Sequence, residues 1–69
     1  MRYLVVLERA ESNWAAYSPD VPGCVATGAT PEETLEAFAE ALRLHLEGLR
    51  EDGLPIPEPR SRAEYVNVP

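Results

Sequence analysis

Two kinds of hydrophobic pattern run along this chain of 69 residues, and they meet near residue 30. Before that point, apolar residues form short runs at 3–7, 14–17 and 24–27, each bounded by polar or turn-forming residues. After it, apolar residues return at intervals of three and four. Short runs between turn residues predict strands, and the second spacing predicts a helix. The pattern therefore predicts an α+β fold with a small antiparallel sheet and one long helix.

The connection between the first two runs is short and polar, which predicts an antiparallel hairpin. A stiff corner then separates the second run from the third. Pro19 and Pro22 each fix a φ angle and remove a backbone donor, Gly23 is free to adopt a positive φ, and Asp20 is a typical turn residue. We expect these four residues to form a structural turn, with the Asp20 side chain hydrogen-bonded inside it.

The helix has clear start and stop signals. Thr30 is a good N-cap, Pro31 suits the first helical position, and Glu33 completes a capping box. Gly53 is a typical residue just beyond a helix end, so the helix is predicted over residues 31–52. Its expected apolar stripe consists of Leu35, Phe38, Ala39, Leu42, Leu46 and Leu49.

Beyond the helix, alternate prolines at 55–59 force an extended segment. Residues 63–68, with apolar residues around Tyr65 and Val66, then predict a final strand. The predicted order is β-β-β-α-β in a single domain over residues 1–69.

One helix covers only one face of such a sheet. Leu4 and Val6 alternate with the residues expected beneath the helix, so they face the other way. An uncovered apolar face usually marks an interface. We therefore predict a homo-oligomer, a dimer or a tetramer, with Leu4, Val6 and Tyr65 at its interface.

Composition narrows the possible partners. The chain has twelve acidic residues and six arginines, giving a net charge of −6. Repulsion from phosphate backbones argues against direct nucleic-acid binding, whereas a basic protein is electrostatically favoured. No segment is typical of a signal peptide or a membrane span, so we expect a cytoplasmic protein. With one cysteine and one histidine, the chain has neither an internal disulfide nor the usual zinc ligands.

No catalytic constellation is evident. Cys24 has no base close to it in the sequence, and His45 lies at the border of the helical apolar stripe. Both are read as packing residues. The helical glutamates form one stripe that points to solvent rather than converging on a metal. We expect no catalytic residue, no metal and no cofactor.

The acidic helical stripe has two interpretations. Its glutamates repel one another, and Leu44 lies among them, opposite the predicted core side. A solvated acidic face is the simpler interpretation; a docking face for a basic partner, anchored by Leu44, is the sharper one. Trp14 and Tyr17 alternate on a short strand, so at least one faces away from the helix. The partner-binding residues predicted on this basis are Trp14, Tyr17, Glu36, Glu40, Leu44 and Glu47.

Six segments carry a resemblance to a known family: Tyr3–Leu7, Trp14–Tyr17, Pro19–Cys24, Gly28–Glu33, Glu51–Gly53 and Pro55–Pro57. Through them, the chain resembles the HicB-type antitoxin family over nearly its whole length. The resemblance implies a truncated RNase H-like fold without the nuclease's metal-binding carboxylates, and a protein that masks a small basic HicA-type RNase toxin. Many relatives carry a further C-terminal DNA-binding segment; this chain stops at Pro69, so we expect no operator binding.

Two other functions compete with an antitoxin. One is a minimal metal-dependent nuclease of the RNase H type, which rests on fold analogy. The other is a stand-alone structural or ligand-binding oligomer that uses the uncovered sheet face. We expect a binding protein rather than an enzyme.

Overall fold

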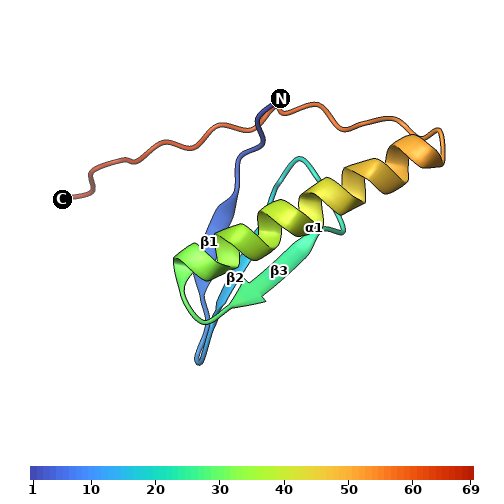
Figure 1. The fold of residues 1–69 in the computed structure, drawn as a ribbon. Helices are drawn as coiled ribbons and strands as arrows, with labels where there is room; N and C mark the ends of the chain where they lie inside the picture. The colour runs from blue at the N-terminus through green and yellow to red at the C-terminus, as the bar shows by residue number, and fades with distance from the viewer.

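The computed structural model describes all 69 residues and has two layers, a three-stranded sheet and one helix. The strands are β1 (Val6–Arg9), β2 (Trp14–Tyr17) and β3 (Val25–Gly28), and the helix is α1 (Pro31–Glu51). Figure 1 shows α1 lying across one face of the sheet, with its C-terminal half projecting beyond the strands. The α+β class and the antiparallel arrangement predicted from the sequence are confirmed.

The register assigns the side chains to two faces. Leu7, Ala16 and Ala26 stand opposite one another across the three strands and face α1. Ala16 is fully buried, and the small alanine side chains let the helix approach the sheet. The neighbouring line is formed by Val6, Tyr17 and Val25, and strand alternation places it on the face away from the helix.

The first strand begins later than its apolar run. Pairing starts at Val6 because its partner, Tyr17, is the last residue of β2, and the corner at Pro19 leaves residues 3–5 without a neighbouring strand. Tyr3 and Val5 still pack against the core. The third strand is likewise one residue later than the predicted 24–27.

The helix follows its predicted bounds to within one residue. The Thr30 side chain accepts a hydrogen bond from the Glu33 N–H at 3.1 Å. At the other end, Gly53 has a φ of +69°, and its N–H and that of Leu54 donate to the carbonyls of Arg50 and Leu49. This pair of bonds is the Schellman motif, which satisfies carbonyls left free at a helix C-terminus.

The buried side of the helix is rotated from the predicted stripe. Thr34 and Phe38 are its fully buried residues, whereas Leu35 is 45% exposed and Ala39 is also exposed. A threonine is tolerated beneath the sheet because its hydroxyl donates to the Thr30 carbonyl at 2.6 Å. The first turn of α1 therefore presents Thr34, not Leu35, to the strands.

The core is small. Only six of the 69 residues are buried, so most apolar side chains keep some contact with solvent. The structure gives a domain of this size few internal contacts to offset the entropy of folding. The apolar members of the core are Ala16, Val21, Cys24 and Phe38, packed against Tyr3, Val5, Leu7, Ala26, Ala41 and Leu42.

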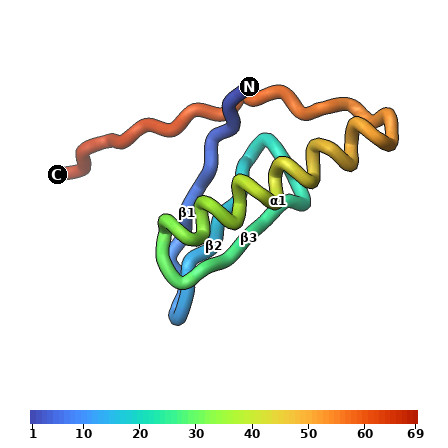
Figure 2. The backbone as a smooth tube through the Cα atoms, in the orientation of Figure 1, coloured from blue at the N-terminus to red at the C-terminus, as the bar shows by residue number.

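The chain after the helix is extended and contains no strand. It runs back along the molecule and past the N-terminus, and the C-terminus ends away from the sheet (Figure 2). The predicted strand at 63–68, and with it the last element of the β-β-β-α-β order, is wrong for the single chain. Its composition favours a strand, but no sheet edge pairs with it, and Tyr65 is fully exposed. The helix of this fold does not combine the length and the apolar character needed to cross a membrane.

Candidate protein-interaction surfaces

The outer side of α1 is an acidic surface with one large apolar residue. Leu44 is 54% exposed and lies on the side of the helix away from the buried Phe38. Glu40 precedes it by four residues and Glu47 follows it by three, so both neighbour it on the helix surface. Glu36 extends the same side by one more turn. We call Glu36, Glu40, Leu44 and Glu47 the acidic helix face.

Arg43 partly neutralises this face. Its guanidinium is 2.6 Å from a Glu40 carboxylate oxygen and 2.8 Å from one of Glu47. Hydrogen bonding to Arg43 lowers the pKa of Glu40, which favours the ionised carboxylate. All three side chains are about half exposed, where such pairs contribute little to stability. Glu36 has no salt-bridge partner and remains an uncompensated charge.

Trp14 and Tyr17 lie on opposite faces of β2. Trp14 stands opposite Gly28 on the helix side, and Tyr17 stands opposite Val6 and Val25 on the other side. The structure therefore does not bring the six predicted partner-binding residues together. They occupy three places: the acidic helix face, the helix side of the sheet and its far face.

The far face of the sheet is apolar and carries no covering element. Tyr17 and Val25 are 36% and 63% exposed, and Val6 and Ala15 beside them are partly exposed. Two polar residues also lie on this face: Thr27, opposite Ala15, and Glu8, whose hydrogen bonding and negative charge raise the pKa of the Tyr17 phenol. The predicted uncovered face thus exists in the single chain.

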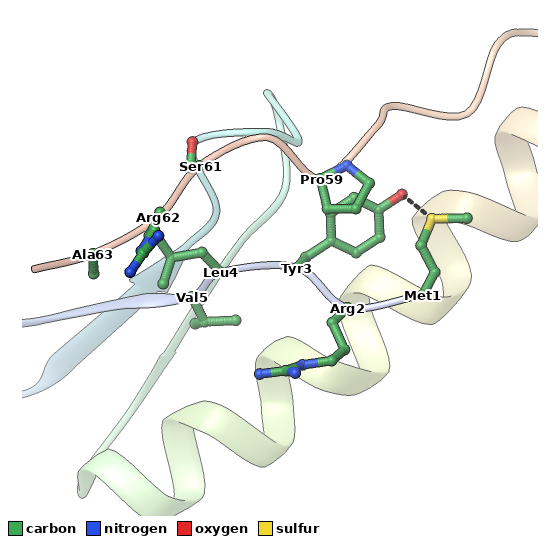
Figure 3. A pocket seen from close by; sticks show the side chains of 9 residues that line it. All are labelled: Met1, Arg2, Tyr3, Leu4, Val5, Pro59, Ser61, Arg62 and Ala63. Carbon is green, nitrogen blue, oxygen red and sulfur yellow. Dashed lines mark hydrogen bonds between the residues drawn. The ribbon is translucent and has the colours of Figure 1, made fainter.

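The three residues predicted at an oligomer interface are separated. Leu4 and Val6 are half-buried and lie outside the cluster packed beneath α1. Figure 3 shows the Leu4 side chain turned toward the C-terminal segment near Arg62, whereas Val5 is turned toward the helix. Tyr65, expected on the same sheet, is on the exposed C-terminal segment instead.

The corner between β2 and β3 holds the C-terminal segment. The Asp20 carboxylate accepts hydrogen bonds from the backbone N–H groups of Arg60 and Ser61, both at 3.0 Å, and from the Ser61 hydroxyl at 2.9 Å. These bonds, led by the Ser61 N–H, lower the pKa of Asp20. Within the corner, the Asp20 N–H donates to the Ser18 hydroxyl at 3.3 Å, and the Val21 N–H donates to the Ser18 carbonyl at 3.2 Å.

Asp20 lies in the predicted turn, but the prediction that its side chain is hydrogen-bonded inside that turn is wrong, because both carboxylate oxygens bond residues 60 and 61 instead. A carboxylate at a Pro-rich corner looks the same whether it bonds its own turn or a segment forty residues away. The backbone of the corner follows expectation: Gly23 has a φ of +83°, between Pro22 and the buried Cys24.

Chemically reactive residues are not grouped. Cys24 is buried, and loss of solvation raises the pKa of its thiol, which disfavours the nucleophilic thiolate. His45 is half-buried on α1. No three His, Cys, Asp or Glu side chains are placed to hold a metal ion together. The surfaces of this chain are suited to contact with another polypeptide.

Comparison with known proteins points the same way. The family model described as a HicB-like antitoxin of bacterial toxin–antitoxin systems matches residues 3–69. The protein named antitoxin HicB 2 of Photorhabdus laumondii is 39% identical over 70 residues, covering all of this chain and 50% of that protein. A chain in the solved HicA3 and HicB3 toxin–antitoxin complex superposes with a TM-score of 0.73 at 28% identity, covering 86% of this chain and 70% of the other.

Relatives differ in length. The chain spans about half the length of the first curated relatives it matches. In contrast, a UPF0150 protein of Thermoplasma acidophilum is 33% identical over 69 residues, covering 99% of this chain and 97% of that protein. Sequences similar to this chain thus occur both within a longer protein named as an antitoxin and in a protein of similar size.

Proposed function

Because this chain belongs to the HicB-like antitoxin family of bacterial toxin–antitoxin systems, we propose that it binds and masks a small basic RNase toxin of the HicA type. The observation that carries the proposal is the acidic helix face, which is exposed, negatively charged and anchored by an apolar side chain. A net charge of −6 supports association with a basic protein. The similarity to a chain of a toxin–antitoxin complex supports the same partner class.

The acidic helix face offers both parts of a docking surface. Leu44 supplies apolar area that is desolvated on contact, and the glutamates around it supply charge complementarity. Arg43 competes with any incoming cation, because it occupies Glu40 and Glu47. Glu36 is free of such competition and is the expected first contact for a basic side chain of the toxin.

The remaining predicted residues lie outside the acidic helix face, and we assign them to self-association and to partner contacts on the two faces of the sheet. We propose that Leu4 and Val6 belong to the interface of a homodimer or tetramer, because the apolar far face has no cover in the single chain. Tyr17 reaches only a partner on that far face, and Trp14 only one at the helix side. A basic toxin on the helix and a second copy on the far face would therefore not compete.

The protein is proposed to be a non-enzymatic, cytoplasmic, single-domain binding protein over residues 1–69 that needs no cofactor. Its charge disfavours direct DNA binding. We propose a truncated RNase H-like origin for the fold, retained as a scaffold for binding rather than for metal-dependent cleavage.

The test measures binding of a recombinant HicA-type toxin by calorimetry, together with rescue of growth in cells that express the toxin. Reversing charge with Glu36→Lys is expected to weaken binding by about tenfold, and more at low salt than at high salt. Leu44→Ala is expected to weaken it at all salt concentrations. Arg43→Gln is expected to strengthen it, since the competing cation is lost.

The control is Glu11→Lys, which makes the same charge change in the exposed β1–β2 connection. It should bind and rescue as well as the wild type. If the helix variants and the control behave alike, the acidic helix face is not the docking surface. If the wild type neither binds the toxin nor restores growth, the antitoxin role itself is refuted.

A further inference from the structure

The C-terminal segment has the chemistry of a strand but no partner. Residues 63–68 are rich in β-branched and aromatic residues, and Tyr65, Val66 and Val68 are 102%, 82% and 84% exposed. No backbone N–H or C=O of residues 62–69 forms a hydrogen bond in the structure. Three large apolar side chains and an unpaired backbone within six residues are a combination that a folded chain rarely leaves in water.

The base of this segment is fixed. Asp20 holds the backbone of Arg60 and Ser61, and the Tyr3 hydroxyl donates to the Pro57 carbonyl at 2.6 Å. The same hydroxyl lies 3.0 Å from the Met1 sulfur, as Figure 3 shows. Residues 62–69 thus leave the molecule from a defined point beside residues 1–5, and their direction carries them away from their own sheet (Figures 1 and 2).

The sheet offers a free edge that is long enough to pair with part of the segment. β1 pairs only with β2, so its outer edge presents unpaired backbone groups along Val6–Arg9. Extended, residues 62–69 reach about 26 Å, about twice the length of this four-residue strand. The edge also borders the apolar far face, on which Val6 lies.

We propose that residues 63–68 of one copy add as a strand to the outer edge of β1 in a second copy, and that the exchange is reciprocal. This exchange would pair the free backbone groups of the segment with those of β1. It would also cover the exposed side chains of Tyr65, Val66 and Val68. A two-fold arrangement gives both copies the same contacts. The inference rests on the self-association proposed above and is independent of the toxin.

The test uses two variants of the full chain, distinguished by mass. One carries Val66→Cys and the other carries Glu8→Cys on β1; the native Cys24 is buried, so the wild type is the blank. After mixing and treatment with a short bis-maleimide, mass spectrometry identifies the linked species. Linked Val66→Cys and Glu8→Cys chains are expected to form about tenfold or more faster than when Glu51→Cys, at the far end of α1, replaces Glu8→Cys.

A second measurement removes strand pairing without altering the folded layers. Val66→Pro deletes a backbone donor, and Val66→Thr keeps both the donor and the strand preference. Light scattering should show the wild type and Val66→Thr as oligomers and Val66→Pro as a monomer, because Val66 is 82% exposed and its backbone forms no hydrogen bond in the single chain that proline would disturb.

Three results would overturn the exchange. The mixed variants would link no faster than the Glu51→Cys control, or a chain carrying both cysteines would link only within itself, meaning that the segment folds back onto its own β1. Alternatively, Val66→Pro would remain an oligomer, so that self-association would survive through another surface. None of these outcomes bears on toxin binding, which the calorimetric experiment tests separately.

Discussion

At Gly28 the sheet and the helix approach too closely for a side chain. A Cβ added there would lie 2.7 Å from the Thr34 hydroxyl and 2.9 Å from the Thr34 backbone nitrogen. The second neighbour is backbone in the first turn of α1, so it cannot rotate away. Gly48, in the last turn of the same helix, has nothing within 4 Å of such an atom. A side chain is therefore excluded at Gly28 by close packing, whereas there is room for one at Gly48.

Gly28→Ala is expected to lower the free energy of unfolding by about 1–3 kcal/mol, the usual cost of overpacking. Gly48→Ala is expected to raise it by about 0.5–1 kcal/mol, because alanine loses less conformational entropy than glycine in a helix. Urea unfolding of both variants and the wild type measures the two changes. Equal stability of the two variants would mean that the close approach of β3 and α1 is not maintained in solution.

Among the elements, the helix was the most predictable and the final strand the least. Helix bounds follow from signals that are local, such as the Thr30 cap and Gly53, and these operate in any context. A strand depends on a partner that the segment itself does not encode. Residues 63–68 have a strand-like pattern, but the single chain provides no strand for them to pair with. Leu35 was wrongly predicted to be buried because the close packing at Thr34 sets the rotation of α1.

One carboxylate holds the C-terminal segment at residues 60 and 61. Hydrogen bonds to Ser61 and Arg60 hold the pKa of Asp20 below its usual value, so ionised Asp20 stabilises the folded arrangement. The contribution is complete above the ordinary aspartate pKa and disappears as pH falls through the lower folded value. The amide NMR signals of Arg60 and Ser61 are expected to titrate at that lower pKa, reporting release of the segment.

Asp20→Asn should give the released amide shifts and fast hydrogen exchange already at neutral pH. Asp52→Asn, which changes a carboxyl group at the end of α1, should leave both amides unchanged. An Asp20 that titrates at its ordinary value, with amides unaffected by Asp20→Asn, would show that the segment is not held by this corner.

For the whole molecule, the sequence correctly indicated an excess of sheet surface over helix cover, because that is a matter of counting elements. The apolar alternation at Leu4 and Val6 predicts the second face of the sheet, and Val6 lies on that face. Partner surfaces were harder to predict, since they depend on which residues become neighbours in three dimensions. Trp14 and Glu36 look equally suitable in the sequence. In the structure, Trp14 lies on the helix side of the sheet and Glu36 lies on the outer side of α1.

A chain with six buried residues is expected to draw part of its stability from association. Binding of a second copy to the folded state alone stabilises it by about 2.7 kcal/mol at a hundredfold excess over Kd. For a domain of this size, that corresponds to a rise in Tm of roughly ten degrees or more. The Tm measured by circular dichroism should therefore increase with protein concentration over about a hundredfold range.

Val25→Glu places a charge on the exposed far face and should flatten this dependence, whereas Leu44→Glu, on the acidic helix face, should leave it unchanged. Both residues are more than half exposed, so neither substitution disturbs the core beneath α1. A wild-type Tm that is constant across the concentration range would mean that the sheet and helix are sufficient alone. In that case the far face would be left for a different polypeptide, and self-association would no longer explain its apolar character.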